Sequence, residues 1–446
     1  LTDELDTVQG TANDDTINGL VSTNGDDSTF NPADTVNGGD GNDTFRLRLI
    51  NEDQGNDTPT SAGREAESVE NLEVRTVFAG GAGTSGEAEV SAADFPDLET
   101  VNIERLRTDD GNDNTNKTDR LNITGLESDN AVAISASDGG SHEVSLAGSP
   151  TDEITLEDAS FGELLANASD GVSGTLTINS DGARNSAGIN LGVDFGSGNE
   201  AAGTSLVING EGDLSASVSN FSTSSSADIA VDGSEATGDL TLSLNTDDRF
   251  TVTGGSGDDT LNHDLDVGGG ASGNGSDLSS DFTASGIETH IVTFAANGGS
   301  TVDAENITGA TTVGTNESTE DVIFENVAAG AAVLARGDGK EDFDDNGGND
   351  PVSEVGSIQV DIAGSNATET PSTVTVDNGG TVLGVRNADG DPRLIESKGI
   401  TVNNTTGIDV VVQDGAAALS SVGGDAAESI SFSGAAMTVG NLTDSD

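Results

Sequence analysis

The chain has no cysteine, no tryptophan and no tyrosine, and only seven of its 446 residues are proline. The lack of cysteine excludes disulfides, zinc thiolate sites and iron–sulfur clusters. The lack of tryptophan and tyrosine disfavours a sugar site, since such sites rest on aromatic platforms. No run approaches the roughly 20 apolar residues that a membrane helix needs, so we expect no transmembrane segment.

Basic residues are also scarce: 15 Lys and Arg stand against 80 Asp and Glu, for a formal net charge of −65. Nucleic acid is therefore excluded as a partner, because phosphate binding needs clustered Lys and Arg. The folded chain faces strong self-repulsion unless cations neutralise it. Bound calcium, high external salt, or both would supply those cations. A halophilic surface protein without specific sites is the alternative.

The sequence lacks the signatures of common secreted hydrolases. Its three histidines are His142, His263 and His290, and none of them begins an H-E-x-x-H zinc motif. No G-x-S-x-G motif occurs either. We interpret His142 and His290 as hydrogen-bonded structural residues and expect that the chain is not an enzyme. A glycosidase, which needs only two carboxylates, stays open.

Glycine is plentiful, with 61 residues, and part of it follows a fixed pattern. Residues 38–46 (GGDGNDTFR) and 254–262 (GGSGDDTLN) match every fixed position of the calcium-binding nonapeptide G-G-x-G-x-D-x-U-x, in which U is apolar. Residues 10–17 (GTANDDTI) keep this frame, with Asn13 in place of a glycine. Glycine allows tight turns that aim carbonyl oxygens inward, and asparagine tolerates positive φ. The aspartate adds a carboxylate, and calcium prefers such hard oxygens.

The three copies predict calcium sites between stacked turns, because one copy supplies only half of a site. The alternative is a set of β-turns that use Asn, Asp and Gly for backbone reasons alone. We favour calcium because each copy ends in an apolar strand residue: Ile17, Phe45 or Leu261. The candidate calcium-binding positions are Asn13, Asp15, Gly38, Gly39, Asp40, Gly41, Asp43, Gly254, Gly255, Gly257 and Asp259.

A further acidic loop, DFDDNG at 342–347, opens like an EF-hand. Its twelfth position is Ser353 instead of glutamate, and Pro351 stands where the exiting helix should form. An EF-hand is therefore disfavoured, whereas a calcium loop with a similar opening stays a candidate. Its ligands would be Asp342, Asp344, Asn346 and Asp350.

A phrase of alternating apolar and polar residues recurs at 69–74 (VENLEV), 98–103 (LETVNI) and 287–292 (IETHIV), and such alternation indicates half-buried strands. Glu70 follows Asp43 by 27 residues, and Glu288 follows Asp259 by 29. This near-constant distance predicts two related calcium-binding β modules, 1–249 and 250–446. A subdivision of the first module near 105–120 stays open.

Short strands and turns are expected elsewhere, with short helices at 161–168 and 327–335. Because the gaps between the strand phrases are unequal, we expect no strict solenoid of one period. The predicted fold class is all-β: calcium-bound β-roll or β-solenoid-like segments with β-sandwich-like layers, in an elongated chain of several modules.

The order of GTANDDTI, DTVNGGDGNDTF and SVENLEV resembles that in the calcium-dependent RTX-type surface-layer (S-layer) proteins of Gram-negative bacteria. GGSGDDTLN followed by SGIETHIV is similar to the same order repeated. The resemblance implies type I secretion, calcium-triggered folding and lattice assembly at the cell surface. This chain departs from the family in being far more acidic and in showing no clear anchoring domain. It begins with Leu1, and we expect a mature or trimmed piece of a longer protein.

The expected function is that of an extracellular structural protein that folds on binding several Ca²⁺ ions and self-assembles into a surface layer or similar lattice. A calcium-dependent adhesin or filament subunit is the alternative, and an RTX-type secreted hydrolase is least favoured. The expected partner is another copy of the chain. A cell-surface polysaccharide, reached through a part outside this chain, is a second candidate.

Overall fold

The computed structural model describes most of the chain in residue detail up to residue 336 and the strand backbones beyond it. The described ranges are 1–52, 57–78, 86–108, 119–127, 129–136, 142–148, 153–168, 175–190, 205–219, 228–245, 249–264, 282–293, 300–316, 322–328 and 331–336, then the strands between 357 and 443. The chain divides into two compact units, Leu1–Asp239 (unit 1) and Leu240–Asp446 (unit 2).

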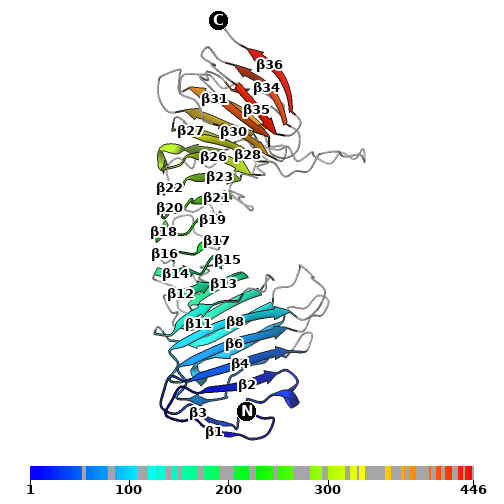
Figure 1. Ribbon diagram of the computed structural model, residues 1–446, viewed down its shortest axis with the longest axis vertical. Helices are drawn as coiled ribbons and strands as arrows, with labels where there is room; N and C mark the ends of the chain where they lie inside the picture. The colour runs from blue at the N-terminus through cyan, green and yellow to red at the C-terminus, as the bar shows by residue number, and fades with distance from the viewer. Residues whose placement is uncertain are drawn as a thin grey trace, which may run out of the picture. The chain divides into compact units, whose positions relative to one another are not determined.

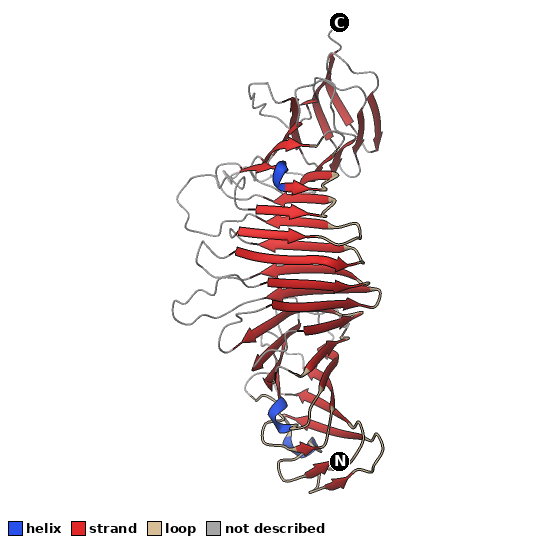
Figure 2. Ribbon diagram, turned by 90° about the vertical axis from the view of Figure 1, so that its left-hand side faces the viewer, coloured by secondary structure: helices blue, strands red, loops and turns tan. Residues whose placement is uncertain are grey.

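Both units are built almost wholly of strands, as Figure 2 shows. The described ranges hold no α-helix and three short 3-10 helices: η1 (Gly25–Asp27), η2 (Ala92–Asp94) and η3 (Ala304–Asn306). Among these residues no helix has the length and apolar character needed to cross a membrane.

Unit 1 is a parallel β-solenoid in which the chain alternates between two sheets (Figure 1). One sheet contains, in hydrogen-bonded order, β2 (Thr16–Ser22), β4 (Thr44–Asn51), β6 (Asn71–Phe78), β8 (Thr100–Thr108), β10 (Ala131–Ile134), β12 (Glu153–Glu157), β14 (Thr175–Asp181), β16 (Ser205–Gly210) and β18 (Asp228–Ala236). The other contains β7 (Glu87–Ser91), β9 (Asp119–Leu126), β11 (His142–Gly148), β13 (Ser160–Ala168), β15 (Arg184–Asn190) and β17 (Asp213–Ser219). A three-stranded sheet holds β1 (Thr7–Gln9), β3 (Thr35–Asn37) and β5 (Ala66–Glu67).

Unit 2 repeats the parallel stacking in three runs of strands. The first is β20 (Arg249–Thr253), β22 (Phe282–Ser285) and β25 (Ile307–Thr308). The second is β19 (Leu240–Asn245), β21 (Thr260–Asp264), β23 (Thr289–Thr293), β26 (Thr312–Asn316), β28 (Ala332–Arg336), β30 (Thr373–Asp377), β33 (Ile408–Val412) and β35 (Ile430–Gly434). The third is β24 (Ser300–Asp303), β27 (Val322–Val327), β29 (Ser357–Ile362), β31 (Thr381–Asn387), β32 (Thr401–Val402), β34 (Ala417–Gly423) and β36 (Met437–Thr443).

We call one turn of the solenoid a coil. The core is a ladder of apolar side chains stacked from one coil to the next. Ile17 pairs with Phe45, Phe45 with Leu72 and Leu72 with Val101, and all four side chains are buried. Successive residues of a strand point to opposite faces, so in-register pairing keeps these four apolar residues on the inner face. The half-buried strands expected from the alternating phrases, and the all-β solenoid class, are therefore confirmed.

The coils differ in length, which reconciles a solenoid with the unequal gaps in the sequence. Corresponding residues lie 28 residues apart from Asp15 to Asp43 and 27 from Asp43 to Glu70, but 19 from Leu240 to Asp259. Stacking requires only that the strands stay in register, and the segments between strands take up the difference.

The two short helices expected at 161–168 and 327–335 are wrong. The first segment belongs to β13, where a shift of register between Ser160 and Glu163 places both Phe161 and Leu164 in the core. This bulge converts a two-residue alternation into a three-residue spacing that imitates a helix. In the second, the buried Val327 and Ala331 belong to the end of β27 and to the turn before β28.

Aromatic rings concentrate at one point of the unit 1 core. Phe30 lies 4.7 Å from Phe45, and Phe45 lies 5.6 Å from Phe95, measured between ring centroids. All three rings are buried. Such tilted and edge-on contacts contribute roughly 0.5–1.5 kcal/mol each beyond the burial of area.

The corresponding cluster of unit 2 contains two histidines. The ring of Phe282 stacks on His290 at 5.3 Å and lies 5.1 Å from His263, and Phe324 meets His290 edge-on. His290 is completely buried, and the hydrogen bonds expected of it are absent, because neither of its ring nitrogens has a partner. Burial, together with the neighbouring His263, lowers the pKa of His290 to about 3.

Coil stacking predicts that Gly254→Ala destabilises the protein strongly. A Cβ at Gly254 would lie 1.9 Å from the carbonyl oxygen of Gly286 in the next coil. We expect a loss of at least about 1–3 kcal/mol, the usual cost of overpacking. Gly25→Ala is the matched control, because its Cβ would meet nothing within 4 Å. Urea unfolding of both variants measures the difference, and equal stabilities would contradict close stacking at Gly254.

The buried His290 predicts a loss of stability in acid. Its folded pKa lies below the ordinary value of 6.5, so only the unfolded chain binds this proton between pH 6.5 and about 3. The contribution of neutral His290 is therefore complete above pH 6.5 and falls as the pH drops toward 3, by on the order of 5 kcal/mol. We expect His290→Leu to flatten this part of the stability–pH curve. Parallel curves for the two proteins, from urea titrations between pH 7 and 4, would refute the assignment.

Candidate functional site

The first two nonapeptide copies stack directly on each other at the start of β2 and β4. A Cβ at Gly10 would lie 1.6 Å from the carbonyl oxygen of Gly38, and one at Gly38 would lie 1.9 Å from that of Ser68. The first glycine of the motif is thus required by the close approach of consecutive coils, whatever ion is bound.

The turn glycines of the second copy adopt the conformation that the motif predicts. Gly39 and Gly41 have φ values of +112° and +136°, which only glycine adopts easily. Asn13, which corresponds to Gly41, does not share this conformation. Among the described non-glycine residues, positive φ occurs at Ser68, Asp158 and Asn326. The role expected of Asn13 as a left-handed substitute is therefore wrong, and its exposed side chain lies on the outer turn.

The motif aspartates form a ladder of hydrogen bonds between coils. The backbone N–H of Asp15 donates to Asp43 Oδ1 at 2.7 Å, and the N–H of Asp43 donates to Glu70 Oε2 at 2.7 Å. The N–H and hydroxyl of Thr11 donate to Asp15 Oδ2 at 2.6 and 2.9 Å. These bonds lower the pKa of Asp15, because they favour its carboxylate form.

The copy at 254–262 repeats this ladder in unit 2. The side chain of Asp259 is fully buried, and its Oδ1 accepts from the N–H of Leu240 at 2.8 Å. Its Oδ2 accepts from the N–H of Gly255 at 2.6 Å, while its own N–H donates to Glu288 Oε2 at 2.8 Å. Both carboxylate oxygens of Asp259 are therefore engaged by backbone donors. Gly254, Gly255 and Gly257 are not among the described glycines with positive φ.

Glu70 and Glu288 also belong to the ladder, although the nonapeptide pattern does not include them. Each comes from the strand phrase that follows a complete nonapeptide, and each caps the N–H of the motif aspartate one coil earlier. The signal was present in the sequence, because the spacings of 27 and 29 residues equal one coil. A repeat length identifies stacking partners only once the chain is known to be a solenoid.

One oxygen of the ladder has no hydrogen-bond partner. Asp43 is completely buried, and its Oδ2 accepts no hydrogen bond. A Cβ at Gly38 would lie 2.6 Å from this oxygen and 1.9 Å from the Ser68 carbonyl oxygen, so both oxygens lie on the same side of Gly38. An unsatisfied buried carboxylate oxygen is costly and is the kind of group that a cation satisfies.

The residues around Asp43 fit calcium in part. Two hard oxygens lie together beside Gly38, one from the buried Asp43 carboxylate and one from the Ser68 carbonyl. The carbonyls of Thr11 and Asn13 lie beside Gly39 and Gly41 instead, and the Thr11 carbonyl already accepts from the N–H of Asp40. Calcium takes six to eight such ligands. The described ranges contain no group of three or more His, Asp or Glu side chains arranged to hold a metal. Asp40 is exposed on the outer turn.

The remaining expected calcium positions, Asp342, Asp344, Asn346 and Asp350, lie outside the described residues. Comparison of the chain with protein-family models, with curated proteins and with solved structures finds no match.

The ladder predicts opposite effects of two matched substitutions in calcium-free buffer. Asp259→Asn should cost about 1–3 kcal/mol, because its amide N–H₂ would face a backbone donor, from Gly255 or Leu240. Asp43→Asn should be neutral or stabilising, because the amide can leave its oxygen on the Asp15 N–H and place its N–H₂ at the unsatisfied position.

Thermal and urea unfolding of the two variants in chelator measures this difference. If both substitutions cost the same, the two aspartates have equivalent surroundings and the asymmetry described above is wrong.

Proposed function

We propose that the chain is an extracellular structural protein whose solenoid units self-assemble into a surface layer or similar array, and whose stacked turns at 10–17 and 38–46 bind calcium. The observation that carries the calcium part is the buried Asp43 Oδ2 without a hydrogen-bond partner, in a chain of net charge −65. The assembly part is supported by the solenoid fold, which repeats similar outer surfaces from coil to coil.

Calcium would act by coupling ion binding to folding. Without an ion, stacking the first two copies buries the Asp43 carboxylate beside the acidic Asp15 and Glu70. A cation at Asp43 Oδ2 would offset this cost, and its binding free energy would become folding free energy. The copy at 254–262 is the weaker candidate, because both oxygens of Asp259 already accept backbone hydrogen bonds.

Calcium would also affect assembly. Copies that each carry 65 net negative charges repel one another, and bound cations reduce this repulsion at the turns that hold them. Monovalent salt screens charge in general without binding the carbonyl-lined turn.

We expect calcium to raise the melting temperature of the protein more than magnesium does, since magnesium dehydrates reluctantly and demands octahedral geometry. Asp43→Asn should lose most of this gain, whereas an exposed acid such as Glu99, changed to Gln, should keep it. Circular dichroism at fixed ionic strength, with chelator, calcium or magnesium, gives the comparison. An equal response of wild type and Asp43→Asn would contradict the assignment of a calcium site to Asp43.

Light scattering across the same calcium series reports assembly. Ordered growth with calcium and little growth in sodium chloride alone is the expected outcome. A protein that stays monomeric throughout would instead favour the calcium-dependent adhesin.

A further inference from the structure

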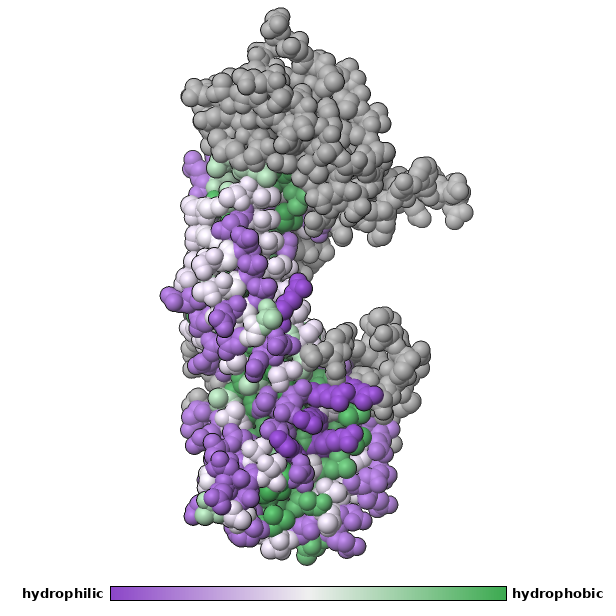
Figure 3. Space-filling model, in the orientation of Figure 1, coloured by the Kyte–Doolittle hydropathy of each residue, from purple (hydrophilic) through white to green (hydrophobic). Residues whose placement is uncertain are grey.

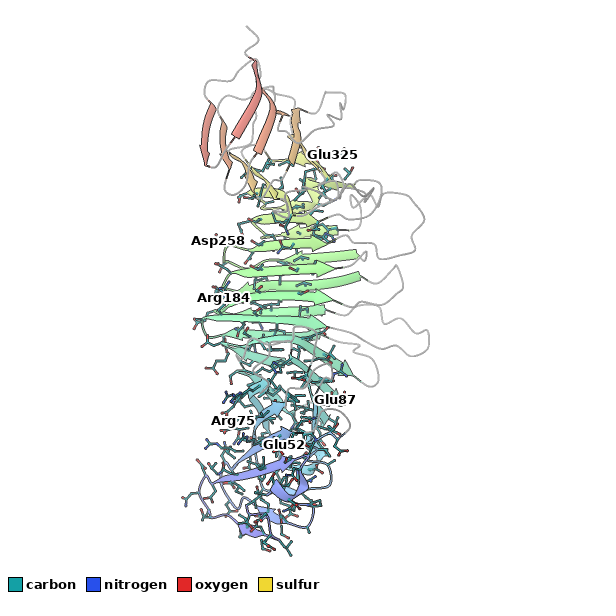
Figure 4. All side chains as sticks on the ribbon, turned by 90° about the vertical axis from the view of Figure 1, so that its right-hand side faces the viewer. Glu52, Arg75, Glu87, Arg184, Asp258 and Glu325 are labelled. Atoms are coloured by element: carbon teal, nitrogen blue, oxygen red, sulfur yellow. The ribbon has the colours of Figure 1, made fainter. Side chains whose placement is uncertain are left out.

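Unit 1 carries a concentrated group of arginines in a chain that has few basic residues. Five of the 15 Lys and Arg residues lie on the outer face of the adjacent strands β4, β6 and β8. Figure 3 shows the dark purple of the most hydrophilic side chains over this part of the molecule, and Figure 4 labels Arg75. We call this surface the arginine face; its residues are Arg46, Arg48, Arg75, Arg105 and Arg107, all exposed.

Three of these arginines stack directly on one another. Arg48 pairs in register with Arg75, and Arg75 pairs with Arg105 across a shift of register. Adjacent strands lie about 4.8 Å apart, and like charges placed directly opposite each other destabilise a sheet. The row is therefore not explained by the stability of the solenoid.

The acids of the same face only partly compensate this charge. Arg46 forms an ion pair with Glu73, and Arg75 forms one with Glu104, both at 2.5 Å. Arg48 has no ion pair among the described residues. The outer face of these strands carries five arginines together with Glu73 and Glu104, so it has an excess of positive charge by count. Guanidinium binds carboxylates in a planar, two-bond geometry, which makes the face suited to an anionic partner.

A complementary surface is present on the same unit. Asp14, Asp40, Asp97 and Glu99 are exposed in the segments just before β2, β4 and β8, and we call them the acidic turn edge. A second copy of the chain is thus a ready source of carboxylates. The exposed backbone edge of β2 is a poor docking site for another strand. The N-terminal amine of Leu1 and the N–H groups of Thr29 and Phe30 already donate to carbonyls of β2.

We propose that the arginine face docks onto the acidic turn edge of a second copy of this chain. The contact is heterologous, with different surfaces meeting on the two copies, so each bound copy presents a free arginine face or acidic edge to the next. This inference rests on the self-assembly proposed above and names the surface that performs it.

Sedimentation velocity at low ionic strength with calcium tests the proposal. The variant carries Arg48→Gln, Arg105→Gln and Arg107→Gln, and it keeps Arg46 and Arg75 with their ion pairs to Glu73 and Glu104. We expect its self-association to be weaker by roughly tenfold or more, as three lost charge contacts imply. The matched control is Arg184→Gln, an exposed arginine on β15 of the same unit, which should associate as wild type does.

A mixing experiment uses the heterologous character of the contact. The triple variant keeps its acidic turn edge, so a small amount added to wild type should bind at one end of a growing assembly and stop it. Shorter assemblies are the expected result. Circular dichroism of the variant confirms that the fold is intact.

The outcomes separate this proposal from the function on which it rests. If wild type assembles and the triple variant assembles equally well, the docking surface is wrong and self-assembly stands. If wild type stays monomeric under every calcium condition, self-assembly itself is wrong. If monomeric wild type is retained on heparin and the triple variant is not, the face binds a polyanion and docking to a second copy is overturned.

Discussion

The close stacking of one coil on the next is the constraint on which the rest of this structure depends. At Gly10, Gly38 and Gly254 the backbones approach so closely that even a Cβ has no room. Parallel pairing in register then aligns each apolar ladder, from Ile17 through Phe45 to Leu72, without disulfides and with few aromatic rings. A lean core is sufficient because each coil buries its inner side chains against both neighbouring coils.

The same stacking gives the glycines and aspartates of the nonapeptide a structural role. Its glycines allow backbone contact, and its aspartates accept the N–H groups that the turn would otherwise leave unpaired. A turn rich in Asn, Asp and Gly uses these residues in the same way without any metal. Calcium binding is therefore favoured at the copy in which a motif carboxylate oxygen, Asp43 Oδ2, has no hydrogen-bond partner.

The charged side chains of unit 1 are unevenly distributed over the fold. The carboxylates of the ladder lie at the turns, whereas the stacked arginines lie on the outer face of β4, β6 and β8. In a chain of net charge −65, long-range repulsion keeps copies apart, and only a local surface of opposite sign allows a specific contact. The solenoid makes this possible because residues one coil apart become neighbours on the surface.

The strand character of the chain is predictable from the sequence, since alternating segments such as 69–74 and 98–103 have the two-residue period of a half-buried strand. The coil length near the motif is predictable too, from the distance between Asp43 and Glu70. The contacts that those residues make depend on how the coils stack. The bulge in β13 made Phe161 and Leu164 imitate a helix, and the pairing of Glu70 with the N–H of Asp43 depends on two segments 27 residues apart. Local patterns specify which face of a strand is apolar, but the partner across a parallel ladder is chosen by stacking, which acts between segments distant in the sequence.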